Sequence, residues 1–287
     1  MRLIIAFILI FTWVSACAPA KKHRKRYAKK DSSERYYKKS QNKPVQAKKK
    51  PPQKLKSLPR LTTSNTSLLP TILNEKDKTL MILINQGKYL VGVKKIAASG
   101  TLRPDANSSH FVTLPAFYID RTEITVENFK KFQPQYSEKP YTNGKPCPQC
   151  PAMGINWNQA RKYCQWAGKR LPSEEEWEAA ARGNSTYTWP WGNEFLPQHA
   201  NTFGKEDGYL SVAPVASFDV GASPYGIMDM TGNVWEWVQT KNKGLQIVKG
   251  GGWTSYNNQS KISFRNKVDA KLKNPTFGFR CQREAGL

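Results

Sequence analysis

Histidine is scarce in this sequence, and its scarcity narrows the chemistry that the chain can perform. Only three histidines, His23, His110 and His199, occur among 287 residues. A Ser-His-Asp triad and a non-haem iron site held by two histidines both need imidazole side chains beside their partners. The three positions lie far apart in the sequence, so nothing indicates such a site. We interpret His110 and His199 as surface or loop residues.

Acidic residues are also few, and their scarcity is uneven. The chain holds 21 Asp and Glu against 45 Lys and Arg, a formal net charge of +24. Residues 21–60 alone carry 17 Lys and Arg and only 2 acidic residues. The basicity therefore belongs mainly to an N-terminal arm and not to a folded face that reads nucleic acid, and no nucleic-acid-binding motif follows it. We expect no nucleic-acid partner.

An apolar run long enough to span a membrane is missing from the N-terminus. Arg2 precedes an apolar run from Leu3 to Val14. A helix of that length spans about 18 Å, whereas the hydrocarbon core of a bilayer is about 30 Å thick. A short apolar run with a basic start is typical of a secretory signal. The sequence predicts a signal peptide over residues 1–16.

Small residues stand directly before the first cysteine, in Val14-Ser15-Ala16-Cys17. This arrangement resembles a bacterial lipobox, in which Cys17 becomes the lipidated first residue. Acyl chains would then anchor the protein to a membrane; ordinary signal cleavage beside an incidental cysteine is the alternative. The predicted location is the bacterial cell envelope, lipid-anchored. In a Gram-negative cell, Ala18 after the cysteine would imply the outer membrane, facing the periplasm or the surface.

Residues 17–75 lack hydrophobic periodicity and are rich in Lys, Pro, Ser, Asn and Gln. Such a segment cannot bury enough apolar surface to offset its chain entropy, so we expect a disordered basic tether. Its charge suits docking on anionic envelope polymers or lipid head groups. A solvated spacer with no partner of its own is the other interpretation.

Segments with hydrophobic periodicity begin near Leu80. Residues 81–84 and 87–92 predict two short strands around a glycine turn. Three helices follow, each marked by a cap or a stop: one from Thr125 to about Phe132, one over 158–167 ended by Gly168, and one opened by a Ser173–Glu176 capping box and ended by Gly183. We assign the globular domain to residues 76–287.

Several motifs occur along this domain in a fixed order. They are the block from Asn156 to Glu178, Trp189-Pro190-Trp191-Gly192-Asn193 with Ala200-Asn201, the block from Ser223 to Trp237, Lys249-Gly250-Gly251-Gly252-Trp253, and Gly278-Phe279-Arg280-Cys281. Together they closely resemble the formylglycine-generating enzyme (sulfatase-modifying factor) family over roughly residues 80–287. The resemblance implies an α+β fold related to C-type lectins, in one compact domain with much irregular loop.

The resemblance also implies where catalytic cysteines would stand. Family members that make formylglycine use a pair of cysteines and copper, placed between the Gly-Gly-Ser-Trp-like and Gly-Phe-Arg-Cys motifs. Here the interval from Trp253 to Gly278 holds no cysteine, and Lys261 and Asn266 occupy the matching positions. Neither side chain can replace a thiolate as a ligand for copper(I). We expect no copper and no formylglycine formation, so no catalytic residue is assigned.

Four cysteines remain after Cys17, and they allow three full pairings. The resemblance implies a disulfide between Cys164 and Cys281. Cys147 and Cys150 form a CxxC within a proline-rich stretch. A local structural disulfide is favoured for this pair, with redox activity and metal binding as alternatives.

Residues suited to the family's two calcium sites are present in this sequence, whereas the family's catalytic cysteines are not. The resemblance places a first site at Asn201, Thr202, Asp207 and Tyr209, and a second at Asp229, Gly232, Val234 and Glu236. Carboxylate and carbonyl oxygens are the ligands that calcium prefers. Turn capping without any metal is the alternative. Trp235 and Trp237, two positions apart, are expected to lie on one face of a strand and in the core.

These observations predict a membrane-anchored lipoprotein whose domain binds without catalysing a reaction. Its expected partner is a protein, peptide or glycan of the cell envelope, bound as part of an assembly or scaffold. An oxidoreductase with a divergent metal site is the alternative function, and it would hold iron or copper where the leading hypothesis expects only structural calcium.

Overall fold

The computed structural model describes residues 71–93 and 108–286. Cys17, the predicted signal peptide and residues 17–70 of the predicted tether lie outside the described residues. All described residues belong to one compact unit. The first described strand begins at Thr71, ahead of residue 76. Across the two described ranges, no helix has the length and apolar character needed to cross a bilayer.

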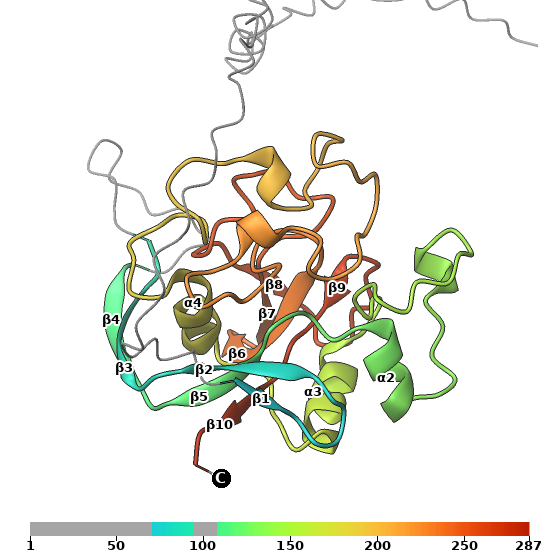
Figure 1. Cartoon of the computed structure of the whole chain (residues 1–287), viewed down its shortest axis with the longest axis horizontal. Helices are drawn as coiled ribbons and strands as arrows, with labels where there is room; N and C mark the ends of the chain where they lie inside the picture. The colour runs from blue at the N-terminus through green and yellow to red at the C-terminus, as the bar shows by residue number, and fades with distance from the viewer. Residues whose placement is uncertain (1–70, 94–107, 287) are drawn as a thin grey trace, which may run out of the picture. The chain divides into compact units, whose positions relative to one another are not determined.

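The strands of the described residues form three small sheets (Figure 1). The first has the order β1 (Thr71–Leu73), β2 (Leu80–Ile84), β5 (Phe117–Asp120) and β10 (Gln282–Glu284), all antiparallel. The second pairs β3 (Gly87–Val91) with β4 (His110–Leu114). The third has the order β8 (Asn266–Val268), β7 (Leu245–Lys249), β6 (Trp235–Asn242) and β9 (Phe277–Gly278).

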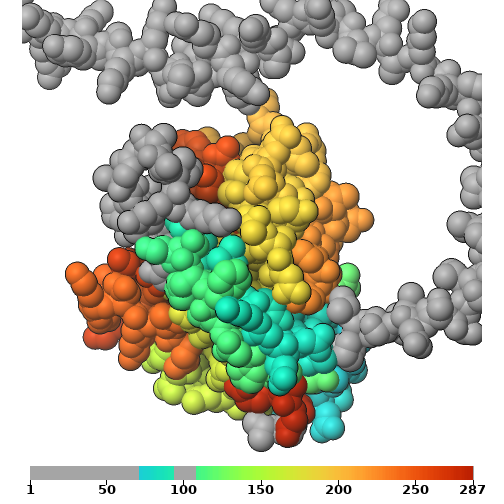
Figure 2. All heavy atoms as spheres, turned by 90° about the vertical axis from the view of Figure 1, so that its left-hand side faces the viewer, coloured from blue at the N-terminus to red at the C-terminus, as the bar shows by residue number. Residues whose placement is uncertain are grey.

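The two strands predicted near residues 81–92 exist, but they do not pair with each other. β2 pairs with β1 and β5, whereas β3 pairs with β4. The turn between β2 and β3 therefore connects the first sheet to the second. Figure 2 shows β3 and β4 side by side on one face of the domain.

Three α-helices lie where the sequence predicts them. They are α2 (Val126–Phe132), α3 (Trp157–Trp166) and α4 (Glu174–Arg182); single 3-10 turns occur at η1 (Lys139–Tyr141), η2 (Pro197–His199) and η3 (Asp219–Gly221). The Thr125 cap and the Ser173–Glu176 capping box are both confirmed. A second capping box, between Asn156 and Gln159, opens α3. Short helices with few long elements and small sheets confirm the α+β class.

Two large clusters of buried side chains and a third, small one make the core of the described residues. The larger one packs α2 and α3 against the third sheet, and Trp235 and Trp237 both belong to it, with exposed fractions of 5% and 0%. The expectation that both tryptophans are core residues is confirmed. The second cluster packs Trp177 and the alanines of α4 against residues from all three sheets.

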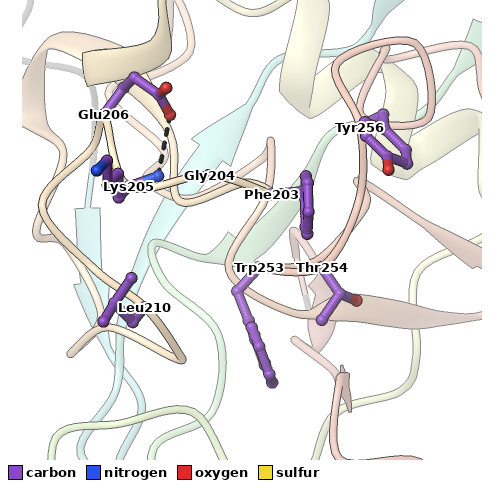
Figure 3. A pocket seen from close by; sticks show the side chains of 8 residues that line it. All are labelled: Phe203, Gly204, Lys205, Glu206, Leu210, Trp253, Thr254 and Tyr256. Carbon is purple, nitrogen blue, oxygen red and sulfur yellow. Dashed lines mark hydrogen bonds between the residues drawn. The ribbon is translucent and has the colours of Figure 1, made fainter.

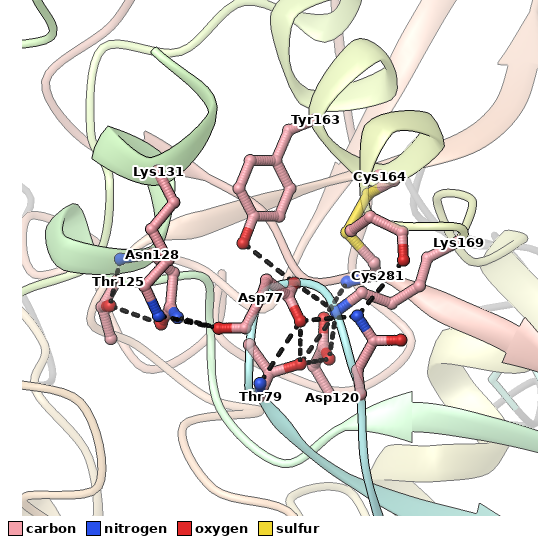
Figure 4. A network of polar contacts seen from close by, with 12 residues as sticks. Asp77, Thr79, Asp120, Thr125, Asn128, Lys131, Tyr163, Cys164, Lys169 and Cys281 are labelled. Carbon is pink, nitrogen blue, oxygen red and sulfur yellow. Dashed lines mark hydrogen bonds and ion pairs between the residues drawn. A yellow bond between two sulfur atoms is a disulfide. The ribbon is translucent and has the colours of Figure 1, made fainter. Parts of the chain in front are cut away.

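A buried polar network joins the start of the described domain to its centre (Figure 4). The Lys169 ammonium lies 2.7 Å from Asp77 Oδ2 and 2.8 Å from Asp120 Oδ1, and all three side chains are almost completely buried. Tyr163 donates its hydroxyl proton to Asp77 at 2.9 Å. The backbone amide of Cys281 donates to Asp120 at 2.9 Å. The turn before β2 is thus tied to α3 and to the C-terminal strand.

Candidate functional site

A surface pocket of about 530 Å³ lies in the loop-rich part of the domain (Figure 3). Its lining comes from two segments far apart in sequence: Phe203, Gly204, Lys205, Glu206 and Leu210 from one, and Trp253, Thr254 and Tyr256 from the other. Phe203, Tyr256 and Leu210 expose 60%, 61% and 80% of their surface. Large apolar side chains gathered at such exposure mark a surface that is available for binding.

A main-chain hydrogen bond joins the two segments: the Phe203 amide donates to the Ser255 carbonyl at 2.9 Å. The Trp253 amide donates to the Asn233 carbonyl at 2.8 Å, which ties the second segment to the block before β6. The rings of Phe203 and Tyr256 meet at 4.9 Å between centroids. This ring contact joins the two sides of the pocket, so the aromatic surface is already formed without a ligand.

Neither Lys261 nor Asn266 lines this pocket. The Lys261 ammonium lies over the Trp189 ring, 5.5 Å from its centroid. Asn266 is exposed at the first position of β8, opposite Val248 of β7. The structure therefore does not bring these two positions together at the aromatic surface, and their match to the missing cysteines stays a prediction.

Ser255 and Ser260 are five positions apart, as Lys261 and Asn266 are. Unlike that pair, the two serines are brought together by the structure. Both are buried, with 3% and 0% exposure. A Cβ placed on Gly251 would lie 3.3 Å from the Ser255 Cβ and 3.0 Å from the Ser260 Cβ. Two side chains that meet beside one glycine, next to the pocket, have the arrangement that a cooperating pair of thiols would need. Sequence reasoning missed this pair, although its spacing was visible.

The hydroxyl groups of these serines are occupied by local contacts. The Ser255 hydroxyl accepts from the Gly252 amide at 2.9 Å, and the Ser260 hydroxyl donates to the Asn257 carbonyl at 3.0 Å. No histidine lines the pocket to activate either hydroxyl. Serine hydroxyls with high intrinsic pKa values also bind copper(I) poorly, because that ion selects soft sulfur ligands. Through these contacts the pair of serines helps to hold the loop.

The residues proposed for the first calcium site lie together in one turn. Asp207 accepts from the amides of Thr202 at 2.9 Å and Tyr209 at 2.8 Å. Asn201 is 1% exposed, and its Oδ1 atom is buried without a hydrogen-bond partner. A buried amide oxygen without a donor costs free energy unless a cation or water satisfies it. This amide oxygen and the Asp207 carboxylate are the side-chain oxygen donors that the set offers to a calcium ion.

The residues proposed for the second calcium site fit less well. Both oxygens of Glu236 accept from Arg280 at 2.7 Å, and one of them also accepts from the Trp177 indole at 2.8 Å. Asp229 accepts from the Ala216 amide at 2.6 Å. Because Arg280 already neutralises Glu236, that carboxylate is engaged and not free to bind an ion. Val234 is buried in an apolar cluster.

Two residues near this second set were missed by sequence reasoning, Glu123 and Arg280. Burial raises the pKa of the Glu123 carboxyl well above its usual range, and the neighbouring Asp229 carboxylate adds to the effect. Burial also raises the pKa of Asp229. Three acidic side chains, Glu236, Glu123 and Asp229, thus surround the single Arg280 guanidinium. Glu123 follows the first sheet and Arg280 precedes β10, so only the fold brings them together.

A glycine is required at position 232, where the segment of the second proposed calcium site approaches Asn201 of the first. Its φ is +77°, and a Cβ there would lie 2.2 Å from the Asn201 carbonyl oxygen. Any other residue would push the Asn201 segment away. Gly232 therefore fits the close approach of two backbone segments, in addition to its place in the motif.

The two remaining histidines do not form a cluster with other ligands. His110 is exposed in β4, and its Nδ1 atom lies 3.0 Å from the Ser108 carbonyl oxygen. His199 is half-buried in a 3-10 turn, and its ring lies 5.2 Å from the Trp191 ring. Across residues 71–93 and 108–286, no group of three or more His, Cys, Asp or Glu side chains is arranged to hold a metal ion.

Both expected disulfides are present. Cys164 and Cys281 are bonded across 117 positions, which confirms the pairing that the resemblance implied. Cys147 and Cys150 are bonded to each other, which confirms the local disulfide. The first joins α3 to the segment before β10, and the second closes a loop between η1 and α3.

Comparison with known proteins agrees with the fold and with the motifs. The sequence model of the family described as "Sulfatase-modifying factor enzyme 1-like domain" matches residues 69–285. Since this match covers most of the chain, the protein belongs to that family, the one that includes the formylglycine-generating enzymes.

Curated relatives share part of the chain. The "Inactive C-alpha-formylglycine-generating enzyme 2" of Bos taurus is 38% identical over 154 residues, 47% of this chain and 51% of the relative. The formylglycine-generating enzyme of Streptomyces coelicolor is 33% identical over 175 residues, 49% of this chain and 54% of the relative. The chain thus spans about half the length of these relatives.

Solved structures match over more of the chain. PvdO from Pseudomonas aeruginosa has 26% identity and a TM-score of 0.64, and the match covers 76% of this chain and 98% of that one. Treponema denticola variable protein 1 has 19% identity and a TM-score of 0.65, covering 75% of this chain and 99% of that one. The second likeness shows the fold alone.

Proposed function

We propose that this protein is a lipid-anchored, non-catalytic binding protein of the bacterial cell envelope, which holds a partner in the pocket between Phe203 and Trp253. The observation that carries the proposal is the pocket itself. It has an exposed aromatic surface, and the side chains that meet beside it are serines, where thiols would be needed for copper chemistry. A binding surface is retained, and the redox groups are missing.

The pocket is suited to a peptide or glycan that offers an apolar face. Phe203 and Tyr256 form a tilted aromatic pair, and Leu210 extends the apolar area opposite them. Aromatic side chains provide large contact area and dominate the energetics of such sites. Lys205 and Glu206 stand at the edge and supply both signs of charge for polar contacts.

The name of one relative is consistent with this proposal. The Bos taurus protein is called inactive, and it shares 38% identity with this chain over 154 residues. The family therefore includes a member named for the loss of the reaction. For the present chain, the loss is inferred from its own residues, and the relative's name only shows that such a loss has a precedent.

The N-terminal segment would anchor the protein. We propose lipidation of Cys17 and a basic tether from there to the domain, which would allow the pocket to move through the space near the membrane. A second contact, between the tether and anionic envelope polymers, would add affinity by raising the local concentration of the domain. Deleting residues 18–70 would separate the two contributions, because it leaves the pocket in place.

Calcium would stabilise one side of the pocket. The proposed ligands Asn201, Thr202, Asp207 and Tyr209 flank Phe203 and Lys205 in the same loop. When bound, the ion would supply positive charge to the Asp207 carboxylate and to the unpartnered Asn201 oxygen. The residues themselves hold the turn through two amide contacts to Asp207. The ion would thus have a structural role in this loop.

The test compares two aromatic residues of equal exposure. Phe203 in the pocket and Phe111 in β4 are each 60% exposed. We expect Phe203→Ala to lower by at least about tenfold the amount of a defined envelope partner that cross-links to the domain, because hot-spot aromatics contribute about 2 kcal/mol or more. Phe111→Ala is the matched control and should retain full binding. Equal retention by both variants would contradict the proposed site.

The loss of chemistry has its own test. The purified domain is incubated in air with copper and a peptide that carries the cysteine motif of sulfatases. We expect no aldehyde by mass spectrometry, because no thiol of the described domain lies at the pocket. Formation of the aldehyde at a catalytic rate would show that the protein is an enzyme.

A further inference from the structure

The two disulfides of the described domain have opposite surroundings. Cys164 and Cys281 are both completely buried. Cys147 is half-buried and sits in a stretch, residues 143–149, whose other members are all exposed, while Cys150 is 3% exposed. Cys147 is therefore the most accessible of the four disulfide cysteines to a thiol in solution, whereas the core covers the other disulfide.

The lengths of the closed loops differ as well. The partners are 3 positions apart in one disulfide and 117 apart in the other. In the chain-entropy description, a disulfide restricts the unfolded chain more strongly when it closes a longer loop. By this description, Cys147–Cys150 stabilises the folded protein less than Cys164–Cys281 does. Exposed disulfides are the ones that are most readily reduced, and regulatory and catalytic disulfides belong to this group.

The short disulfide loop also caps α2. The carbonyl oxygens of Cys150 and Pro148 accept from the amides of Val126 and Glu127, at 2.8 and 2.9 Å. These are the first two amides of the helix, which have no partner within it. Because the disulfide restricts the backbone between the two cysteines, it helps to hold both carbonyls in place. Breaking it would loosen this end of α2.

The other side of the loop contacts the segment that follows the pocket. The Gln149 carbonyl accepts from the Val215 amide at 2.9 Å. Cys150 packs with Val212 in a small buried cluster, and the pocket residue Trp253 packs against the same cluster. The loop is thus in contact, through one layer of side chains, with a wall of the pocket.

We propose that Cys147–Cys150 is a thiol–disulfide exchange site that accepts electrons from an exposed dithiol of another protein. A thiolate of the partner forms a bond to the Cys147 sulfur, the bond to Cys150 breaks, and Cys150 leaves as a thiolate that takes up a proton. The partner's second thiolate then attacks the partner's first sulfur, the one that is bonded to Cys147 in the mixed disulfide. Cys147 is released and protonated, and the partner is left as a disulfide.

Two electrons and two protons reach the loop in this exchange. Reduction frees the backbone between the two cysteines, so the cap of α2 and the contact to Val215 both weaken. The reaction does not depend on the proposed binding function. Its consequence for the pocket, through Trp253, rests on that function.

The decisive experiment uses the full folded protein and dithiothreitol as the dithiol. The protein is equilibrated at graded ratios of reduced to oxidised dithiothreitol, alkylated and digested, and the labelled cysteines are counted by mass spectrometry. We expect Cys147 and Cys150 to be half-labelled at a ratio at least about tenfold lower than Cys164 and Cys281. Labelling of all four together, as the protein unfolds, would overturn the proposal.

A second arm follows the structural consequence by hydrogen exchange on the selectively reduced protein. The amides of Val126, Glu127 and Val215 should exchange at least about tenfold faster than in the oxidised protein. The amide of Ala167, which donates to the Tyr163 carbonyl near the other disulfide, serves as the internal control. A Cys147→Ser, Cys150→Ser variant should reproduce the pattern without reductant. Unchanged exchange in both samples would refute the coupling, whatever the partner-binding assay shows.

Discussion

Two regions of this domain are built on different principles. The framework, defined here as α3 with β5, β10 and the turn at Asp77, is cross-linked by a buried disulfide and a buried ion pair. The pocket loops, defined as residues 201–216 and 253–260, consist mainly of turns and expose large aromatic side chains. The difference places the main stabilising contacts and the surface proposed for binding in separate parts of the domain. Substitutions should therefore affect one without the other.

The largest effect is expected from the framework disulfide. Cys164→Ser with Cys281→Ser should lower the free energy of unfolding by about 5 kcal/mol, because the disulfide closes a loop of more than 100 residues in the unfolded chain. Urea denaturation followed by circular dichroism measures the change. A loss no greater than that caused by removing Cys147–Cys150 would remove the distinction between the two regions.

Removing the buried cation should cost nearly as much. Lys169→Met leaves Asp77 and Asp120 buried without a partner, and such a broken pair costs about 3–5 kcal/mol. The same denaturation assay applies. Lys162→Met, on the exposed side of α3, is the control and should change the value by less than about 0.5 kcal/mol. A small effect at both positions would mean that water reaches the Asp77 network.

Calcium should act on the pocket loops and not on the framework. At a concentration about 100 times the dissociation constant, the ion should raise the free energy of unfolding by about 2.7 kcal/mol. Asp207→Ala should abolish this increase, whereas Asp219→Ala, an exposed acidic residue in η3, should not. The measurement is unfolding with calcium and with chelator. An identical curve under both conditions for the wild type would disprove the proposed role.

The CxxC disulfide should contribute less to stability than the framework disulfide. Cys147→Ser with Cys150→Ser should cost about 2 kcal/mol, because only a short loop is closed. Denaturation of this variant beside the framework variant gives the ratio of the two effects. A cost above about 4 kcal/mol would show that the loop belongs to the framework.

The smallest effect on stability is expected in the pocket. Phe203→Ala removes a side chain that is already 60% exposed, so the free energy of unfolding should change by less than about 0.5 kcal/mol. Binding should fall as described above, and the contrast between the two measurements defines the role of the residue. A large loss of stability would show that the Phe203–Tyr256 contact is structural.

Local elements were largely predictable from the sequence. The Ser173–Glu176 capping box and the Gly168 and Gly183 stops bound α3 and α4 closely, because capping depends on side chains within one turn of the helix. The capping box at Asn156 has the same type of pattern and could have been found in the same way. The burial of Trp235 and Trp237 followed from their spacing in a strand.

Pairing between distant segments was harder to predict. Strands β2 and β3 follow each other in sequence but belong to different sheets. Asp77 forms an ion pair with Lys169, more than 90 positions away. Glu123 and Arg280 likewise come from segments that are far apart in sequence and meet near Glu236. Hydrophobic pattern alone does not specify which of several similar partners a strand or a charge will choose.

The sequence by itself determined the family, the helices, the Cys164–Cys281 pairing and the absence of cysteine between Trp253 and Gly278. The helices and the missing cysteine depend on residue identity and on contacts within a few positions, whereas the disulfide pairing was implied by the resemblance to the family. Only the tertiary structure decided that Phe203 meets Tyr256 across a pocket and that Ser255 and Ser260 meet beside Gly251. It also decided that one disulfide has a half-buried cysteine, whereas the other is completely buried. The physical reason is that exposure and long-range contact depend on how the whole chain packs, which no local pattern encodes.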